Sequence, residues 1–470
     1  MKILKNKKFQ TILLYLIPFI ISIGTLLIFW PGIYTYDGNN QWNQVVSNNI
    51  SNAHPFLSTF VLLILSKIWN SNTVLFIFQI IVFSLIWGNI CSELLKEKKN
   101  IKLIVVYSII LCLVPIISIY SITAWKDVLY SYFLLAIVYF LYIGSKKDYN
   151  YNKKEYVFIG LLLFLVFSYR HNGMIVAPLL FILLMILMIK GKNKDNLKRS
   201  IIIPITFIIS FTVISIPKNH YLSNLNVEDD KPNLGTIDSY AAWIMGAHIN
   251  KNYITDEDLE FLNKFIEIDE WKNVYSPFLI NALNLSSTRN DQYILDNLDE
   301  FRSIFIKYSL KHPLTVVEHY MKADALLWSP IPVGYVYQYD FKLWGPDYGF
   351  DVRDTSLFPI LNTAYEKVIT LTMKRPIRVV MYQPATIMYI SIILTIILIK
   401  SLKNKRLWVI LTPMLANITS LLPINLAQDL RYVYINYLTL GFVGLLIVLN
   451  YKEVLAYLKN LFKKCKFKRA

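Results

Sequence analysis

The first long apolar run of the chain ends in the segment Trp30-Pro31-Gly32-Ile33-Tyr34-Thr35-Tyr36-Asp37-Gly38-Asn39-Asn40-Gln41. This segment has a single acid, Asp37, among aromatic and amide side chains, and residues 52–55 (Asn-Ala-His-Pro) follow it closely. Apolar runs resume after it. Two interpretations fit a polar, turn-rich loop with one carboxylate between apolar runs: a site of chemistry at a membrane surface, or a solvated connection.

The composition is that of a membrane protein. The 470 residues are 55% hydrophobic and only 17% charged, with a mean hydropathy of +0.44, whereas a soluble domain carries roughly 25% charged residues. Apolar runs near the length of about 20 residues that crosses a bilayer recur along the chain. The net charge of +17 sits mostly in short basic clusters between these runs. That placement indicates cytoplasmic loops facing anionic membrane lipids and argues against a nucleic-acid partner.

We therefore expect an all-α polytopic membrane protein with about ten transmembrane helices. The expected spans are 9–30, 73–95, 101–120, 128–144, 155–169, 174–190, 200–216, 379–399, 407–424 and 433–450. The run 56–69 is too short to cross and predicts a re-entrant or surface helix. If it does not cross, the basic clusters at 96–102, 146–154, 190–199, 400–406 and 452–469 all fall on the side of the basic N-terminus. This agreement predicts that both termini are cytoplasmic.

Three parts follow from this topology. Residues 1–216 form a transmembrane module with outer loops at 31–72, 121–127 and 169–173; residues 217–378 form an extracytoplasmic region of mixed structure; residues 379–470 form the last spans and a basic cytoplasmic tail. The short outer segments contain Asp37, His54, Lys126, Asp127, Arg170, His171, Asp429 and Arg431. Ionisable groups near the membrane are costly unless they are paired or line a wet cavity, so we expect a polar cavity at the outer face.

The region 217–378 has two kinds of sequence. Thr255 followed by three acids predicts the start of a helix. The aromatic, Pro- and Gly-rich stretch 327–348 suits either sugar stacking or an aromatic belt on the bilayer. The chain has no Gly-rich phosphate loop, no CxxC pair, no HExxH and no GxSxG motif. The cytoplasmic segments are too short to fold a nucleotide-dependent domain, so an activated donor must reach the outer site another way, which a lipid-linked donor does naturally.

The order of these parts resembles the GT-C superfamily of polyprenyl-phosphate-sugar-dependent glycosyltransferases, such as the protein O-mannosyltransferases and aminoarabinose transferases. Asp37 matches the acid of their first outer loop, and His54-Pro55-Phe56-Leu57 resembles their HPPL motif, which begins a surface helix. Tyr169-Arg170-His171-Asn172-Gly173 resembles an outer turn of a Gram-positive branch, and Arg431-Tyr432 resembles a late Arg-Tyr element. The chain departs from the pattern where Gly38 follows Asp37 in place of a second acid and where Phe56 replaces the second proline.

The resemblance implies transfer of a sugar from a polyprenyl-phosphate donor to a cell-envelope glycan, lipid or protein, at the outer face of the cytoplasmic membrane, with inversion. A carboxylate beside the acceptor hydroxyl suits Asp37 as general base. Fixed cations stabilise a leaving phosphate, which suits Arg431, Arg170 and Lys126, with His171 as a further phosphate contact. Asp127 has two open roles: it binds a divalent cation (Mg²⁺ or Mn²⁺) together with Asp37, or it orients Lys126. The substrate-binding candidates are Tyr36, Gln41, His54 and Trp125.

Two other functions stay open at this stage. A cell-envelope polysaccharide polymerase is also polytopic and would depend on arginines of 217–378 rather than on Asp37. A transporter or flippase of lipid-linked sugars would place acids in the middle of its spans or show inverted repeats. The sequence shows neither feature clearly.

Overall fold

The structure is a computed structural model that describes residues 6–51, 54–97, 99–191, 195–223, 234–334, 356–374 and 376–467. Within these ranges the chain is all-α, as predicted, and pairing of extended segments is limited to two isolated bridges, Ile33 with Thr123 and Leu279 with Ala427. The chain divides into two units. The first comprises 1–225, 341–417 and 431–470, and the second comprises 226–340 and 418–430.

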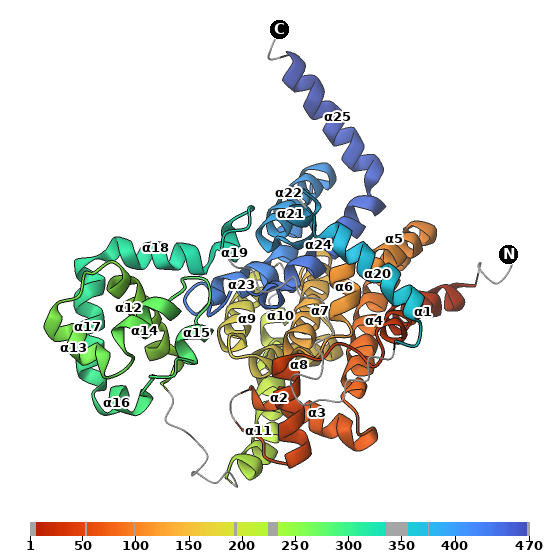
Figure 1. Cartoon of the computed structure of the whole chain (residues 1–470). Helices are drawn as coiled ribbons and strands as arrows, with labels where there is room; N and C mark the ends of the chain where they lie inside the picture. Colours follow the sequence, from red (N-terminus) through yellow and green to blue (C-terminus); the bar gives the residue numbers. More distant parts are fainter. Residues whose placement is uncertain are drawn as a thin grey trace. The chain divides into compact units, whose positions relative to one another are not determined.

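The first unit contains all the helices of the N-terminal half up to residue 223 and most of those after residue 356 (Figure 1). Its helices are α1 (Lys7–Ile28), α2 (Tyr36–Ser47), α3 (Phe56–Ile68), α4 (Thr73–Lys96), α5 (Ile101–Leu113), α6 (Pro115–Tyr120), α7 (Lys126–Lys146), α8 (Lys153–Tyr169), α9 (Gly173–Ile189), α10 (Asp195–Arg199), α11 (Ile202–Ser223), α20 (Pro359–Thr372), α21 (Ile377–Tyr382), α22 (Pro384–Leu402), η5 (Lys405–Leu411), α24 (Ile435–Leu449) and α25 (Tyr451–Phe467). Two further helices run across the unit boundaries, α23 (Thr412–Leu421) and η6 (Leu430–Val433).

Among the described residues, six helical stretches are long and apolar enough to cross a membrane. They are Lys7–Ile28, Thr73–Lys96, Lys126–Lys146, Asp195–Tyr221, Pro384–Leu402 and Leu430–Leu449. Three apolar helices are shorter: Phe56–Ile68, Ile101–Leu113 and Gly173–Ile189. The chain thus has the helices of a multi-pass membrane protein, while the predicted total of ten spans, their sidedness and the domain boundaries at 216 and 378 stay predictions.

Helix α7 lies at the centre of the first unit. Its apolar stretch is 89% buried, and α4, α8, α24 and η5 pack against it. A helix that is apolar on all sides, as α7 is, needs burial on all sides. Helix α11 is the opposite case, because only 11% of its apolar stretch is buried and side chains such as Ile208 and Ile216 are exposed. Apolar side chains exposed along such a long helix are suited to contact with lipid.

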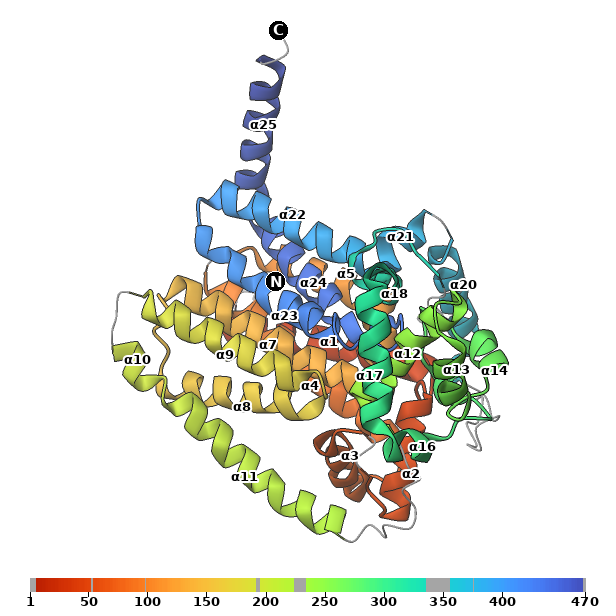
Figure 2. The ribbon, with the colours of Figure 1, turned by 90° about the vertical axis from the view of Figure 1, so that its left-hand side faces the viewer.

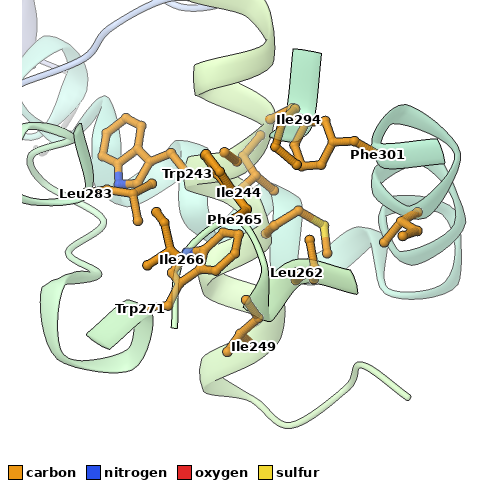
Figure 3. Packing of buried hydrophobic residues seen from close by; sticks show 14 of the residues in the cluster. Trp243, Ile244, Ile249, Leu262, Phe265, Ile266, Trp271, Leu283, Ile294 and Phe301 are labelled. Carbon is orange, nitrogen blue, oxygen red and sulfur yellow. The ribbon is translucent and has the colours of Figure 1, made fainter. Parts of the chain in front are cut away.

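The second unit has its own helices and its own hydrophobic core. Its helices are α12 (Thr236–Asn250), α13 (Asp256–Asn263), α14 (Ile268–Val274), α15 (Asn281–Asn284), α16 (Asp291–Asp296), α17 (Leu298–Lys311), α18 (Pro313–Ala323) and α19 (Ala325–Trp328). Helix α12 packs against α14, α17 and α18. Figure 3 shows Trp243 of α12 among buried side chains that include Phe265, Trp271 and Phe301.

Two expectations for the region 217–378 can be followed in this unit. Helix α13 begins at Asp256 with Thr255 at its N-cap position, which confirms the predicted helix start. The described residues 234–334 of this region are mainly helical, with short turns between the helices. The aromatic stretch proposed for sugar stacking or for a bilayer belt lies largely in 335–355, outside the described residues.

The core of the second unit predicts a large cost for truncating Trp243. Its side chain is fully buried, and its Nε1 donates a hydrogen bond of 2.6 Å to the Ser276 carbonyl. We expect Trp243→Ala to destabilise this unit by about 3–5 kcal/mol. The measurement is protease cleavage within 234–334 of the full-length protein in detergent as a function of temperature. The control, Ile237→Ala in the same helix, removes a side chain that is 79% exposed and should leave the cleavage curve unchanged; equal curves for both variants would contradict the assignment.

Candidate functional site

Backbone pairing holds the segment before α2 against the segment before α7. The Ile33 amide donates to the Ile122 carbonyl at 2.9 Å, and the Ala124 amide donates to the Ile33 carbonyl at 2.9 Å. The Thr35 hydroxyl adds a bond of 2.8 Å to the Ala124 carbonyl. These contacts bring the first turn of α2 next to the first turn of α7, so residues far apart in sequence enter one site.

The local structure at the start of α2 favours an acid at position 37 and leaves no room for a second one at position 38. Thr35 is the N-cap, and its hydroxyl accepts a bond of 3.1 Å from the Gly38 amide. Asp37 lies in the first turn, where the helix dipole favours a negative charge. A Cβ on Gly38 would lie 2.5 Å from the Cβ of Ala124. A second acid after Asp37, expected from the GT-C resemblance, therefore has no room.

Asp37 is held by two cations. Its Oδ2 accepts from Arg431 Nη1 at 2.8 Å and from Lys126 Nζ at 3.1 Å. Burial raises the pKa of the Asp37 carboxyl, but the charges of Arg431 and Lys126 outweigh that effect and hold the pKa well below its usual range. Asp37 is therefore ionised at all physiological pH values in this arrangement.

Lys126 also connects Asp37 to His54. Its Nζ lies 3.1 Å from His54 Nδ1, so the ammonium donates and the imidazole accepts. Burial and the nearby Lys126 charge lower the pKa of His54 to about 4. His54 is thus neutral near pH 7 and positions the lysine without adding charge.

The second acid, Asp127, pairs with Arg170. Arg170 Nε lies 2.9 Å from Asp127 Oδ1, and Arg431 Nε lies 3.9 Å from Oδ2. The Asp127 side chain is only 1% exposed. One role proposed for Asp127 was to orient Lys126. In the structure Lys126 pairs with Asp37, and the Asp127 carboxylate faces Arg170 and Arg431.

Aromatic rings line the two arginines. The Arg170 guanidinium lies 4.5 Å from the Tyr432 ring centre, and the Arg431 guanidinium lies 5.3 Å from the Trp125 ring and 5.2 Å from the Tyr432 ring. Tyr432 was not among the predicted site residues, although its place next to Arg431 in the Arg-Tyr element was a usable signal. Such rings hold a guanidinium plane in position while its N–H groups form hydrogen bonds in that plane.

Hydrogen bonds of the buried Asn417 side chain hold the Tyr432 backbone in place. Asn417 Nδ2 donates to the Tyr432 carbonyl at 2.8 Å, and Asn417 Oδ1 accepts from Asn172 at 3.0 Å and from Tyr130 at 3.1 Å. Asn417 was missed because a lone amide in an apolar run gives no periodic signal. The turn that provides Asn172 depends on Gly173, because a Cβ there would lie 1.8 Å from the Val166 carbonyl oxygen.

A cavity of about 220 Å³ opens beside Arg170. Its polar lining includes Arg170, His171 and Lys218, and its walls are mostly apolar side chains of α3, α8, α9 and α11. A second cavity of about 300 Å³, entirely apolar in its lining residues, shares Phe167 with the first and follows α8, α9 and α11. The first cavity thus has basic side chains in its lining, and the second, which shares Phe167 with it, is lined by apolar side chains.

The remaining predicted residues lie in different places. His171 is exposed and lines the cavity. Tyr36 is 69% exposed at the first position of α2. Gln41 is buried and donates to Ser58 at 2.8 Å and Thr59 at 3.1 Å, so it ties α2 to α3 and does not face Asp37's cationic partners. Asp429 belongs to the second unit.

The donor set fits an anion better than a divalent cation. Three cations, Lys126, Arg170 and Arg431, face the two carboxylates of Asp37 and Asp127. A metal ion would add positive charge to a cluster that already has a surplus, and it would have to displace these cations from both carboxylates. Across the described ranges no three His, Cys, Asp or Glu side chains are grouped to hold a metal. The residues present do not fit the Mg²⁺ or Mn²⁺ considered from the sequence.

Comparison with known proteins adds nothing to this geometry. No protein-family model, no curated protein and no solved structure matches the chain. The GT-C resemblance rests on short motifs and their order, and the function has to be argued from the site itself.

The buried pair Asp127–Arg170 predicts a strong effect when one partner is removed. Arg170→Met leaves a carboxylate that is 1% exposed without its nearest cation, which we expect to cost about 3–5 kcal/mol. Removing both charges in Arg170→Met with Asp127→Leu should recover most of that loss. Thermal unfolding in detergent measures both.

The matched control is an exposed pair. Lys322 and Glu318 are 44% and 46% exposed, and Lys322→Met should cost less than about 1 kcal/mol. Equal unfolding temperatures for Arg170→Met and Lys322→Met would show that the Asp127–Arg170 pair is not buried as described.

Proposed function

We propose that this chain is a GT-C-type glycosyltransferase that moves a sugar from a polyprenyl-phosphate donor to a cell-envelope acceptor. The observation that carries the proposal is the junction of one carboxylate with two cations: Arg431 and Lys126 share Oδ2 of Asp37. A base for an acceptor hydroxyl and cations for a leaving phosphate are the two groups that such a transfer needs.

The cavities support a lipid-linked donor. Arg170, His171 and Lys218 stand at the basic end of the first cavity, and the second cavity continues along α8, α9 and α11 with an apolar lining. A phosphate at the basic end would leave the polyprenyl chain next to exposed apolar side chains of α11, where lipid would meet it. Guanidinium groups bind phosphate through two parallel N–H bonds, which favours Arg170 and Arg431 over Lys126 as the main contacts.

Donor binding would make the Asp37 carboxylate a stronger base. In the free protein the pKa of Asp37 is held below its usual range by Arg431 and Lys126. When a donor phosphate takes over hydrogen bonds from these two cations, their hold on Asp37 weakens and the pKa of its carboxyl rises. Asp37 is then a better proton acceptor when the donor is present than when it is absent.

The transfer itself is a single displacement. The acceptor oxygen bonds to the anomeric carbon while the bond from that carbon to the phosphate oxygen breaks. The hydroxyl proton goes to Asp37, and the leaving polyprenyl phosphate takes the bonding electrons and is stabilised by Arg431, Arg170 and Lys126. Attack from the side opposite the phosphate inverts the configuration.

The topology of the proposal follows the basic loops. Ten spans with both termini in the cytoplasm would place Asp37, Asp127, Arg170 and Arg431 at the outer face of the cytoplasmic membrane. The acceptor there is a cell-envelope glycan, lipid or protein.

The test is turnover by Asp37→Asn. Wild type and variant are reconstituted at equal abundance with a panel of undecaprenyl-phosphate sugars and cell-envelope acceptors, and release of undecaprenyl phosphate is measured. We expect wild type to turn over at least one donor and Asp37→Asn to lose at least about a hundredfold in rate. The control is Asp269→Asn, the same chemical change at an exposed position of α14, which should leave the rate unchanged.

Each contrary result points to a different function. Full activity in Asp37→Asn would remove Asp37 from the mechanism and favour the polysaccharide polymerase. Movement of a lipid-linked sugar across the bilayer by wild type, with no release of undecaprenyl phosphate, would favour the flippase.

A further inference from the structure

Helix α25 has two faces of opposite character. Tyr451, Val454, Leu455, Leu458, Leu461 and Phe462 recur at spacings of three and four residues, so they share one face. Lys452, Lys459, Asn460 and Lys463 lie on the rest of the helix surface. Such a pattern in a globular protein normally predicts that the apolar face is covered.

The apolar face of α25 is largely uncovered by the protein. Val454 is buried, and α25 packs against α22 and α24. Farther along, Leu455 is 50% exposed, Leu461 43% and Phe462 68%. Figures 1 and 2 show α25 extending beyond the other helices of the first unit. A contiguous apolar face of this kind needs a partner outside the chain.

The direction of α25 fits a bilayer surface. Figure 2 shows α25 running crosswise to α7 and α9, and not alongside them. Helix α25 begins directly after Asn450, the C-cap of α24. Helix α24 makes up most of the apolar stretch Leu430–Leu449, which is long enough to cross a membrane. A helix that begins where a span ends and runs across it lies in the interfacial plane.

The charges select the kind of surface. Lys452, Lys459 and Lys463 are exposed, and Glu453 is the single acid in the whole segment 451–470. Lysines beside an apolar face favour anionic headgroups. The same lysines would repel those of a second copy packed face to face.

A pocket at the start of α25 has matching chemistry. It has a volume of about 200 Å³ and is lined by Lys99, Lys146, Glu97 and Asn450 together with leucines of α22 and α24. Lys99 Nζ donates to Asn450 Oδ1 at 2.5 Å, and Lys146 pairs with Glu97. Two ammonium groups against one carboxylate, with apolar walls beside them, suit a phosphate headgroup whose acyl chains run along the leucines.

We propose that α25 is an interfacial helix that binds the anionic phospholipids of the membrane surface, with the Lys99–Lys146 pocket at its start holding one headgroup. The inference is independent of sugar transfer, because none of its residues belongs to the candidate site. It assigns to the basic tail a defined depth and orientation in the headgroup layer.

The experiment uses the full-length protein in nanodiscs. Cys465 is replaced by serine; the other two cysteines, Cys91 and Cys112, are buried. A single new cysteine at Leu455 on the apolar face, or at Asn460 on the opposite face, carries an environment-sensitive fluorophore. Doxyl-labelled lipids then report the depth of each position, in phosphatidylcholine discs with and without phosphatidylglycerol.

We expect quenching at position 455 to be at least about twofold stronger than at position 460 in phosphatidylglycerol discs, and the difference to shrink in pure phosphatidylcholine and in high salt. Equal, water-like emission from both positions in anionic discs would overturn the proposal. So would protection of position 455 that appears only in discs with two protein copies, since the occupant would then be a second chain.

A second measurement tests the pocket. Native mass spectrometry should show phosphatidylglycerol retained by wild type and by the control Lys154→Gln, whose exposed lysine lies outside the pocket. The variant Lys99→Gln with Lys146→Gln should lose at least half of that retention. Unchanged retention, or retention replaced fully by inorganic phosphate, would show that the pocket does not hold a lipid headgroup.

Discussion

The arrangement of the candidate site in the first unit depends on one oxygen atom with two cationic partners. Asp37 Oδ2 accepts from Arg431 of η6 and from Lys126 at the start of α7. These three side chains come from positions separated by most of the chain, and the bonds fix the relative positions of α2, α7 and η6. The neighbouring Asp127–Arg170 pair adds the α8–α9 turn to the same cluster.

Assembling five charged side chains in this cluster costs free energy, and that cost is an argument that the cluster has a function beyond stability. Removing charges from water near a membrane costs free energy that hydrophobic residues of similar volume would not cost. The arginines are also oriented by the rings of Trp125 and Tyr432. Asn417 holds Tyr432 in place through its backbone carbonyl. A surplus of one cation over the carboxylates leaves the cluster short of one negative charge, which a phosphate would supply. Structural stability alone explains neither the surplus nor the basic end of the adjoining cavity.

The sequence predicted some of this architecture and missed other parts for physical reasons. The all-α class followed from apolar runs of membrane length, and α1, α4, α7 and α22 lie close to four of the expected spans. Asp37, Lys126, Asp127, Arg170 and Arg431 were chosen because they fell on one predicted side of the membrane, and the structure brings all five into one ion-pair cluster. Their catalytic roles stay predictions.

The parts that sequence could not give depend on side-chain direction. The sequence placed Gln41 in a loop beside Asp37, but the structure has it in α2, bonded to Ser58 and Thr59. In the sequence, Gly38 is a departure from the family pattern. In the structure, only a glycine fits there, because a Cβ would clash with Ala124 across the paired segments.

The most direct test of the proposed site is an experimental structure of the protein in nanodiscs with undecaprenyl phosphate. We expect the phosphate within hydrogen-bonding distance of Arg431 and Arg170 beside Asp37, with the polyprenyl chain along α8 and α11. A phosphate bound elsewhere, with the Arg431–Asp37 pair intact, would contradict it.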